Sequence, residues 1–480
     1  MVRAAMATST TDIVQKLWNL CTLLREDGVT YHQYVTELTY LLFLKMMKEQ
    51  QREENALPKN YRWDKLTALE GVEQLDFYKL LLLELGKANN RLVKDIYENA
   101  STTLKKPKTL AALVKAFDEL DWFSGEREGL GDLYEGLLEK NANEVKSGAG
   151  QYFTPRPLVT AMVECLKPQP GELVQDPAAG TGGFLIEADR YVKSKTDNLF
   201  DLKAPQQEFQ RKRAFYGMEL VEETRRLALM NLLLHNIEGD LRPGDTLSPL
   251  GSQLPKADVI LTNPPFGTKA GGGKPSRDDF TFPTSNKQLA FVEHIYRGLK
   301  PGGRAAVVVP DNVLFEDNVG REIRSDLMDK CDLHTVLRLP TGIFYAQGVK
   351  TNVLFFTRGA TDKGHTKATW FFDMRANMPA FGKRTPFTHE HFTEFLKAYG
   401  EDANGKSKRK DQGEEGRFRK FTREAIKERN DNLDVSWLKD DSHTDSEDLP
   451  EPEVVLAQIR EKLEAALAAV AELESGMESP

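Results

Sequence analysis

The spacing of apolar residues changes along the chain, and each change predicts a different kind of structure. Up to about residue 148 the apolar positions follow helical spacing, with few glycines and prolines, which predicts a helical domain. The densest apolar run, residues 38–47, contains Lys45 and is predicted to be a core helix. From about residue 149 to 395, short apolar runs alternate with helical patterns, which is typical of a doubly wound α/β sheet.

The remainder of the chain is first polar and then helical again. Residues 396–448 carry two basic runs interrupted by acids, 406–410 and 417–420, and a solvated linker or extension is favoured over a DNA-backbone contact. In residues 449–480 apolar side chains follow alternating steps of three and four, namely Leu456, Ile459, Leu463, Ala466, Val470, Leu473 and Met477. A helix this short is marginal alone. We therefore expect it to dock on a partner helix, with packing on its own domain as the alternative. The predicted segments are 1–148, 149–395, 396–448 and 449–480.

Three carboxylates and one carboxamide stand at the ends of predicted strands. The strand candidates are residues 172–176, 214–219 and 257–261, with a further one before Gly244. Asp176, Glu219 and Asp245 end or follow the first three along the chain, and Asn263 follows the last. Because open α/β sheets bind ligands at the carboxyl ends of their strands, we expect these four side chains to belong to one site.

The residues after the last of these strands, Asn263, Pro264, Pro265 and Phe266, suit the methylation of an aromatic amine. An exocyclic amine such as adenine N6 is a poor nucleophile because its lone pair is delocalised into the ring. If the Asn263 side-chain oxygen and the Pro264 carbonyl accept its two hydrogens, the lone pair localises and can attack an electrophilic methyl group. Pro265 has no N–H to compete, and Phe266 offers a face on which a flipped base could stack. Taken alone, the segment is also compatible with a strand that ends in a proline-rich turn.

The loop after Asp176 indicates the methyl donor. It contains Gly180, Thr181, Gly182 and Gly183. Glycines between a strand and a helix let the backbone approach a cofactor closely. A dinucleotide fold requires Gly-x-Gly-x-x-Gly here, whereas an acidic strand end followed by Gly-Thr-Gly-Gly is the loop type used for S-adenosylmethionine. Asp176 would then contact the cofactor's ammonium group, Glu219 its ribose hydroxyls and Asp245 its adenine amine.

The order of these motifs resembles that of the N6-adenine DNA methyltransferases. From about residue 12 to the C-terminal helix, the chain is also similar to the modification (M) subunit of type I restriction-modification systems. The passages that carry this resemblance are residues 141–144, 151–157, 284–288, 310–315, 339–348 and 434–438. The resemblance implies residues 263–266 as the catalytic loop. It implies as cofactor contacts Gln151, Tyr152, Phe153, Thr154, Pro155 and Arg156, together with residues 181–183 and Glu219.

The resemblance also implies a fold, a reaction and partners. The fold is a doubly wound S-adenosylmethionine-dependent methyltransferase core with a helical N-terminal domain, which closes over DNA, and a C-terminal helical tail. An M subunit transfers the methyl group to adenine N6 in a DNA sequence read by a separate specificity (S) subunit. Two copies of M per S form the core onto which a restriction (R) subunit assembles. The net charge of −8 agrees, because DNA affinity comes mainly from Lys and Arg. A partner is thus expected to hold most of the DNA, with a local basic cleft as the alternative.

Several features limit the class of protein. Three isolated cysteines, Cys21, Cys165 and Cys331, favour neither a disulfide framework nor a zinc site, and no metal site is predicted. No apolar run approaches the ~20 residues of a membrane span, and no signal peptide is visible. We therefore expect a cytoplasmic protein without a membrane segment.

Two loops near the catalytic segment have a predicted part in DNA binding. Residues 271–276 are not a phosphate loop, because Thr268 stands where the first glycine belongs and Pro275 follows the lysine. They are predicted to form a mobile loop that orders when DNA enters. Phe344 and Tyr345 are candidates for the opposite face of the flipped base, with core packing as the alternative for one of them.

Two other functions remain open from the sequence. Asn-Pro-Pro-aromatic loops also serve the methylation of protein glutamines and of guanine amines in RNA. The chain could instead be a catalytically silent subunit that scaffolds a restriction complex. Intact Asp176, Glu219 and Asn263 argue against the silent subunit. No motif for DNA cleavage or ATP hydrolysis is visible, so cleavage would require the R subunit.

Overall fold

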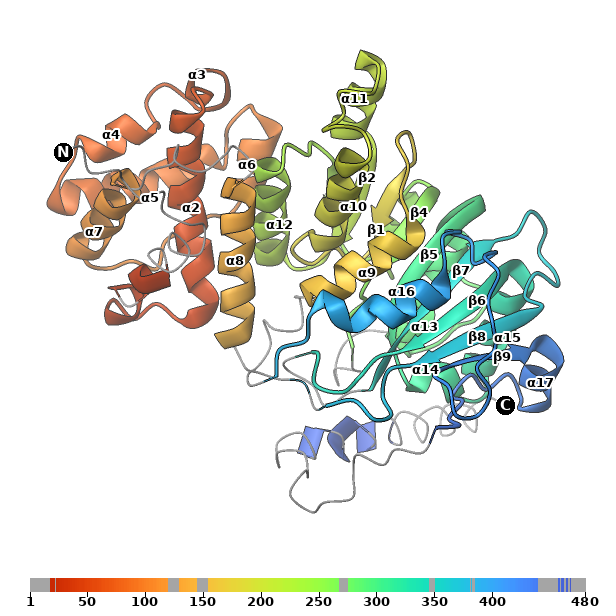
Figure 1. Ribbon diagram of the computed structural model, residues 1–480. Helices are drawn as coiled ribbons and strands as arrows, with labels where there is room; N and C mark the ends of the chain where they lie inside the picture. The colour runs from red at the N-terminus through yellow and green to blue at the C-terminus, as the bar shows by residue number, and fades with distance from the viewer. Residues whose placement is uncertain are drawn as a thin grey trace, which may run out of the picture. The chain divides into compact units, whose positions relative to one another are not determined.

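The structure is a computed structural model, and its chain forms two compact units (Figure 1). It describes residues 18–21, 23–119, 129–144, 154–266, 275–344, 350–379, 381 and 385–438, and in the C-terminal segment residues 456–457, 459–461, 463–464 and 467. Unit 1 comprises Met1–Phe153, Gly180–Gly182 and Val221–Glu238, and unit 2 comprises Thr154–Ala179, Gly183–Leu220 and Gly239–Pro480.

Unit 1 is helical where the structure describes it, as the spacing of its apolar residues predicts. Its helices are α2 (Tyr31–Glu49), α3 (Glu53–Ala56), α4 (Trp63–Thr67), α5 (Gly71–Leu85), α6 (Arg91–Tyr97), α7 (Pro107–Asp118), α8 (Gly129–Glu144) and α12 (Glu222–Leu234). The apolar run at residues 38–47 lies in α2 and is buried throughout. Lys45 is accommodated there because its ammonium group lies 2.7 Å from carboxylates of both Glu49 and Asp118. The predicted core helix is therefore confirmed.

Within the described residues, unit 2 contains a nine-stranded sheet. The strands lie in the order β3-β2-β1-β4-β5-β7-β6-β8-β9. The strands are β1 (Val174–Asp176), β2 (Phe215–Glu219), β3 (Asp240–Pro243), β4 (Ala257–Thr262), β5 (Leu299–Pro310), β6 (Cys331–Arg338), β7 (Thr351–Arg358), β8 (Ala368–Asp373) and β9 (Phe418–Thr422). The first five strands pair in parallel, whereas β7 is antiparallel to both β5 and β6. The predicted doubly wound core with a late hairpin-like pair is confirmed, although β8 and β9 extend the sheet beyond that pair.

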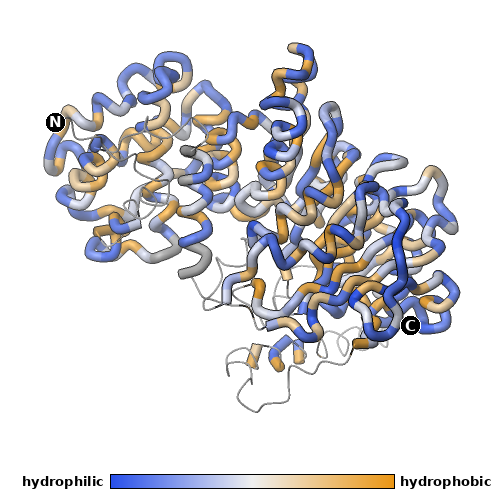
Figure 2. The backbone as a smooth tube through the Cα atoms, viewed as in Figure 1, coloured by the Kyte–Doolittle hydropathy of each residue, from blue (hydrophilic) through white to orange (hydrophobic). Residues whose placement is uncertain are grey.

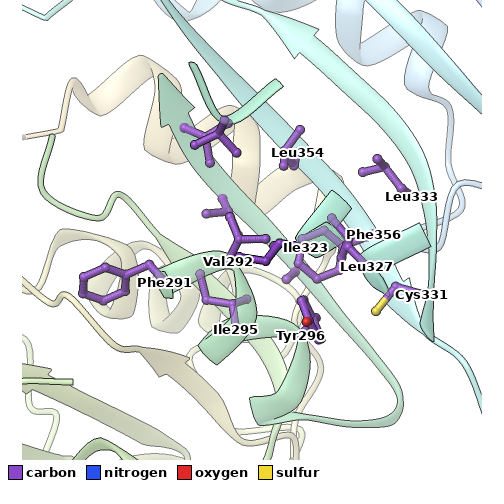
Figure 3. Packing of buried hydrophobic residues seen from close by; sticks show 14 of the residues in the cluster. Phe291, Val292, Ile295, Tyr296, Ile323, Leu327, Cys331, Leu333, Leu354 and Phe356 are labelled. Atoms are coloured by element: carbon purple, nitrogen blue, oxygen red, sulfur yellow. The ribbon is translucent and has the colours of Figure 1, made fainter. Parts of the chain in front are cut away.

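Helices cover both faces of this sheet. The described helices of unit 2 are α9 (Arg156–Leu166), α10 (Gly183–Ser194), α11 (Ala204–Lys212), α13 (Lys287–Gly298), α14 (Asn312–Phe315), α15 (Val319–Lys330), α16 (Thr393–Tyr399) and α17 (Arg423–Glu428), with short 3-10 turns at Pro249–Gln253 and His389–Phe392. Figure 3 shows the core on one face, where side chains of α13 and α15 meet Phe356 of β7. The preceding residue, Phe355, points to the other face and contacts Phe395 and Tyr399 of α16.

The solvated-linker interpretation of residues 396–448 is wrong for residues 418–435, while the boundaries of the four predicted segments stay predictions. Strand β9 pairs antiparallel with β8, and Phe418 is 1% exposed. Ile426 and Val435 belong to the core that α13 and α15 cover. An edge strand alternates buried and exposed side chains, so its average composition is hydrophilic. Figure 2 shows how blue the chain is before this strand, compared with the mostly orange central strands.

The basic runs of that segment contribute to the fold. Arg409 donates to the Thr335 hydroxyl at 2.9 Å, and its guanidinium lies 4.8 Å from the ring centroid of Tyr399. Arg417 donates to the carbonyls of Asp373 and Ala376 at 2.9 and 2.7 Å. Composition alone did not distinguish these structural arginines from solvated or DNA-binding ones.

Some predictions fall on residues outside the described ranges. These are Gln151, Tyr152, Phe153 and Tyr345, residues 271–274 of the predicted loop at 271–276, and most of the C-terminal helix. The described members of its apolar stripe, Leu456, Ile459 and Leu463, are helical and 49–64% exposed. The docking prediction therefore stays a prediction.

Two findings bear on the class of protein. The three cysteines are free thiols buried in the fold. Within the part of the chain that the structure describes, no helix combines the length and the apolar character that a bilayer crossing demands.

Candidate active site

The glycine loop begins where β1 ends. The chain leaves β1 at Asp176, and α10 begins at Gly183. Gly180 has φ of 52° and Gly182 has φ of 83°. These values lie in the left-handed region that residues with a Cβ adopt at a cost, so the backbone path itself requires glycine at both positions.

Asp176, Glu219 and Asp245 lie at the carboxyl ends of adjacent parallel strands, as the sequence predicts. Asp176 is the last residue of β1 and pairs with Gly217 of β2, two residues before Glu219. Glu219 pairs with Pro243, the last residue of β3, and its carbonyl accepts the N–H of Gly244 at 3.0 Å. The three carboxylates therefore belong to one edge of the sheet.

The Asp176 side chain is in an unusual electrostatic setting. It is 1% exposed, and one oxygen accepts the Ala178 N–H at 3.1 Å. Burial raises the pKa of Asp176 to about 7, and the charge of Glu219 acts in the same direction. Among the described residues no lysine or arginine forms an ion pair with Asp176. A carboxyl in such a place gains most from a cation supplied by a ligand.

Asn263 directly follows β4, which lies between β1 and β5. Its amide nitrogen donates to the hydroxyl of Thr154 at 3.1 Å. Its Oδ1 atom is buried and has no hydrogen-bond partner among the described residues. Buried acceptors are almost always paired in folded proteins, so this oxygen is an acceptor that the described residues leave available. Of the two prolines that follow, Pro264 is buried and Pro265 is exposed.

The two described aromatic candidates contact each other. The rings of Phe266 and Phe344 have centroids 5.8 Å apart and planes inclined at 86°. This edge-to-face contact differs from the parallel arrangement in which two rings enclose a base. The assignment of Phe344 to the second face of the base therefore stays a prediction.

In the described part of the 151–156 segment, Thr154 contacts a residue of the site, whereas Pro155 and Arg156 have other contacts. Thr154 accepts from Asn263, and Pro155 caps the N-terminus of α9. The Arg156 guanidinium lies 3.8 Å from the Glu187 carboxylate of α10. Sequence reasoning grouped these residues as cofactor contacts and missed the link between Thr154 and Asn263. No periodicity could have shown it, because the two residues are 109 positions apart.

Sequence reasoning also missed a link between the strand-end loops. The Thr246 hydroxyl donates to the Pro177 carbonyl at 2.5 Å, and the Thr246 carbonyl accepts from Arg277 at 3.0 Å. Arg277 is held in turn by Asp279, at 2.5 and 2.7 Å, and by Nδ1 of His294, at 3.1 Å. Burial and the Arg277 charge lower the pKa of His294 to about 3. His294 is therefore neutral and fixes Arg277 without adding charge.

Three passages that carried the family resemblance have structural roles. Asn286 caps α13 by accepting the N–H groups of the second and third residues after it, at 3.0 and 3.2 Å. Asp311 accepts a bidentate pair of hydrogen bonds from Arg375 at 2.5 and 2.9 Å. Asp434 lies 3.2 Å from Arg338.

One further group of potential metal ligands belongs to unit 1. Asp132, Glu135 and His235 present ligand atoms within 4.8 Å of one another. Carboxylates commonly gather without an ion, so we assign no metal to this group.

Comparison with known proteins identifies the family of this chain. A family model described as N-6 DNA Methylase matches residues 125–447, and another described as HsdM N-terminal domain matches residues 13–117. The chain is 55% identical to the type I restriction enzyme EcoKI methylase subunit of Escherichia coli (strain K12), over 95% of this chain and 93% of that subunit.

Two solved structures are similar over nearly the whole chain. A crystal structure of the EcoKI M protein is 50% identical, covers 98% of this chain and 97% of its own, and superposes with a TM-score of 0.59. A chain from a type I restriction-modification system is 27% identical, covers 98% of this chain and 99% of its own, and has a TM-score of 0.75. The predicted family and enzyme class are confirmed. The chain belongs to the N-6 DNA methylase family of adenine-specific DNA methyltransferases, and within it to the methylase subunits of type I restriction enzymes.

Proposed function

We propose that this chain methylates adenine N6 in a specific DNA sequence, as the modification subunit of a type I restriction-modification complex, with S-adenosylmethionine as the methyl donor. The observation that carries the proposal is the Asn263 side chain. Its oxygen, at the end of β4, is buried and has no hydrogen-bond partner among the residues described, while its nitrogen is held by Thr154. This is the arrangement needed to accept a hydrogen from a substrate amine.

The described residues fit a bound S-adenosylmethionine. The buried Asp176 carboxyl, with its pKa raised to about 7, would gain from the cofactor's ammonium group. Glu219 and Asp245, on the neighbouring strands, are proposed to hold the ribose hydroxyls and the adenine amine. The other proposed contacts are Gln151, Tyr152, Phe153, Pro155, Arg156, Gly180, Thr181, Gly182 and Gly183. When bound, the cofactor supplies an electrophilic methyl group on a sulfonium.

The catalytic loop acts on the adenine. Flipping the base out of the duplex costs a few kcal/mol of unstacking, which stacking on Phe266 partly offsets. Asn263 Oδ1 and the Pro264 carbonyl then accept the two N6 hydrogens, so that the nitrogen lone pair is localised as the methyl group approaches. Hydrogen bonds that strengthen in the transition state lower the barrier. The residues of the loop thus supply orientation and charge stabilisation.

We propose that the partners of this chain are DNA, an S subunit that reads the sequence and an R subunit that assembles on a core of two M and one S. The exposed apolar stripe of the C-terminal helix, at Leu456, Ile459 and Leu463, supports docking on the S subunit. The net charge of −8 supports the proposal that a partner subunit contributes to DNA binding. A solved relative at 27% identity comes from work on complex assembly in a type I system.

The test is transfer of a tritiated methyl group to duplex DNA by the chain assembled with its S subunit. Asn263→Ala is expected to lower the single-turnover rate by about a thousandfold, because it removes an acceptor used in the transition state. Phe266→Ala is expected to lower it by about tenfold to a hundredfold through lost stacking. Both variants should still bind the S subunit and unfold at the wild-type temperature.

Other acceptors are tested beside DNA. Labelling of release factors or ribosomal RNA in preference to duplex DNA would contradict the proposal and favour a glutamine or guanine acceptor. Absence of any transfer by the assembled wild-type complex, with cofactor bound, would favour a silent scaffold. Near-normal turnover by Asn263→Ala would show that the amide has another role.

A further inference from the structure

We propose that Thr154 is a positioning residue: its hydroxyl holds the Asn263 amide nitrogen and thereby fixes the amide with Oδ1 toward the substrate amine. The inference rests on the proposed function of Asn263. It gives Thr154 a part in the chemical step, beyond the cofactor-binding segment to which sequence reasoning assigned it.

A carboxamide needs such a partner because its two ends are alike in shape and opposite in chemistry. The oxygen accepts hydrogen bonds, whereas the NH2 group only donates them. Rotating the amide by half a turn would place a donor against the N6 hydrogens of adenine. The lone pair would then stay in the ring, and methyl transfer would not be assisted. Nothing within residues 263–266 selects between the two orientations.

The structure shows the amide in the orientation that the reaction requires. Asn263 Nδ2 lies 3.1 Å from Thr154 Oγ1, and a hydroxyl oxygen can accept the amide N–H. Asn263 Oδ1 is buried and has no hydrogen-bond partner within the part of the chain that the structure describes. An unpaired buried acceptor is unfavourable until a donor arrives, so the bond to Thr154 keeps the site ready for the substrate.

Thr154 is itself held rigidly, as a positioning residue must be. It directly precedes Pro155, which restricts its backbone to extended conformations. Pro155 is the N-cap of α9, and the first buried turn of α9 includes Leu158 and Val159. The hydroxyl is therefore presented from a fixed backbone.

The experiment compares Thr154→Val, Thr154→Ser and a matched control in single-turnover DNA methylation at saturating S-adenosylmethionine, with each variant assembled with the S subunit. Thr154→Val is expected to slow the chemical step by about tenfold to a hundredfold, because the amide loses its partner and its preferred orientation. Thr154→Ser keeps the hydroxyl and should stay within about threefold of wild type. The dissociation constant for the cofactor should change by less than about twofold in both.

Thr357→Val is the matched control. The Thr357 hydroxyl also bonds an asparagine side chain, Oδ1 of Asn404, at 3.2 Å and is partly buried. The Thr357→Val variant also loses a hydrogen bond between a threonine and an asparagine side chain, but this bond lies outside the proposed site. Its methylation rate should therefore equal that of wild type. A loss as large as that of Thr154→Val would mean that the effect comes from general destabilisation.

A second comparison uses the Asn263→Asp background. Both carboxylate oxygens are acceptors, so this side chain needs no fixed orientation. Adding Thr154→Val there should reduce the rate by less than about twofold, whereas a purely structural role would give the same loss in both backgrounds. This pair also decides the matter if Thr154→Val weakens the fold, because the loss of stability would be common to both.

Three results would overturn the inference. They are an unchanged rate in Thr154→Val, a weakened cofactor affinity with an unchanged chemical step, or an equal loss in the Asn263→Asp background. Each can occur while Asn263→Ala remains inactive, in which case only the role of Thr154 is wrong. An active Asn263→Ala would instead contradict the proposed function.

Discussion

Carboxylates at strand ends differ between the two halves of the unit 2 sheet. In the half formed by β1 to β5, Asp176 ends β1 in a buried position, and among the described residues no arginine or lysine forms an ion pair with it. In the other half, Asp373 ends β8 and lies 3.4 Å from Arg338. Asp311, directly after β5, where the two halves meet, is held by Arg375.

The difference separates a binding role from a structural one. A buried carboxylate with its own arginine has its charge balanced within the chain and has little to gain from a ligand. A buried carboxyl without such a partner has its pKa raised, as in Asp176, and a cationic ligand supplies the missing charge. Position at a strand end is therefore shared by both groups, and the source of the balancing charge distinguishes them.

The largest expected effect is on the pH dependence of stability at Asp176. Between the ordinary carboxyl pKa near 4 and about 7, the folded protein holds a proton that the unfolded chain has released. The free energy of unfolding therefore falls as pH rises through this window. The gap between the two pKa values corresponds to roughly 4 kcal/mol. From pH 4 to pH 7, the free energy of unfolding of the wild type should therefore fall by about that amount more than the free energy of unfolding of Asp176→Asn. Urea unfolding without cofactor measures both values.

The ionisation of Asp176 should also make the affinity for the cofactor depend on pH. Because an ammonium group favours the ionised carboxylate, the wild-type affinity for S-adenosylmethionine should rise as pH increases through about 7. The affinity of Asp176→Asn should be lower and should lack this increase. If the free energy of unfolding depended on pH in the same way in both proteins, a cationic side chain of this protein would already balance the charge of Asp176. The comparison between the two halves of the sheet would then fail.

The next effect concerns Arg375, whose side chain is 10% exposed beside Asp311. Arg375→Met should lower the free energy of unfolding by about 3 kcal/mol, because it leaves the Asp311 charge without its bidentate partner. The affinity of the folded protein for S-adenosylmethionine should not change. Chemical unfolding and calorimetric titration measure the two quantities. A loss of affinity without loss of stability would place Asp311 and Arg375 with the binding residues.

Local patterns explain which parts of the site could be predicted from the sequence. Asp176, Glu219 and Asn263 follow short apolar runs, and parallel pairing brings their strand ends to one edge without further information. Strand β9 could not be predicted in this way, because it has one buried face and pairs with β8 across about fifty residues of chain. The bond between Thr154 and Asn263 also depends on tertiary structure. Both contacts join residues that are far apart in the sequence, and no local pattern predicts which distant residues will meet.

The smallest effect is expected at Asp434, in a passage that resembled the family and was assigned to a linker. Its side chain is 35% exposed and lies 3.2 Å from Arg338. Arg338 also lies 3.4 Å from Asp373 and donates to the carbonyl of Val435, so it keeps partners when Asp434 is lost. Asp434→Asn should therefore lower the free energy of unfolding by about 1 kcal/mol or less, with unchanged methylation. A large loss of methylation in folded Asp434→Asn would instead mean that Asp434 takes part in the reaction, although Arg338 balances the charge of its carboxylate. Charge balance would then no longer separate structural carboxylates from binding ones.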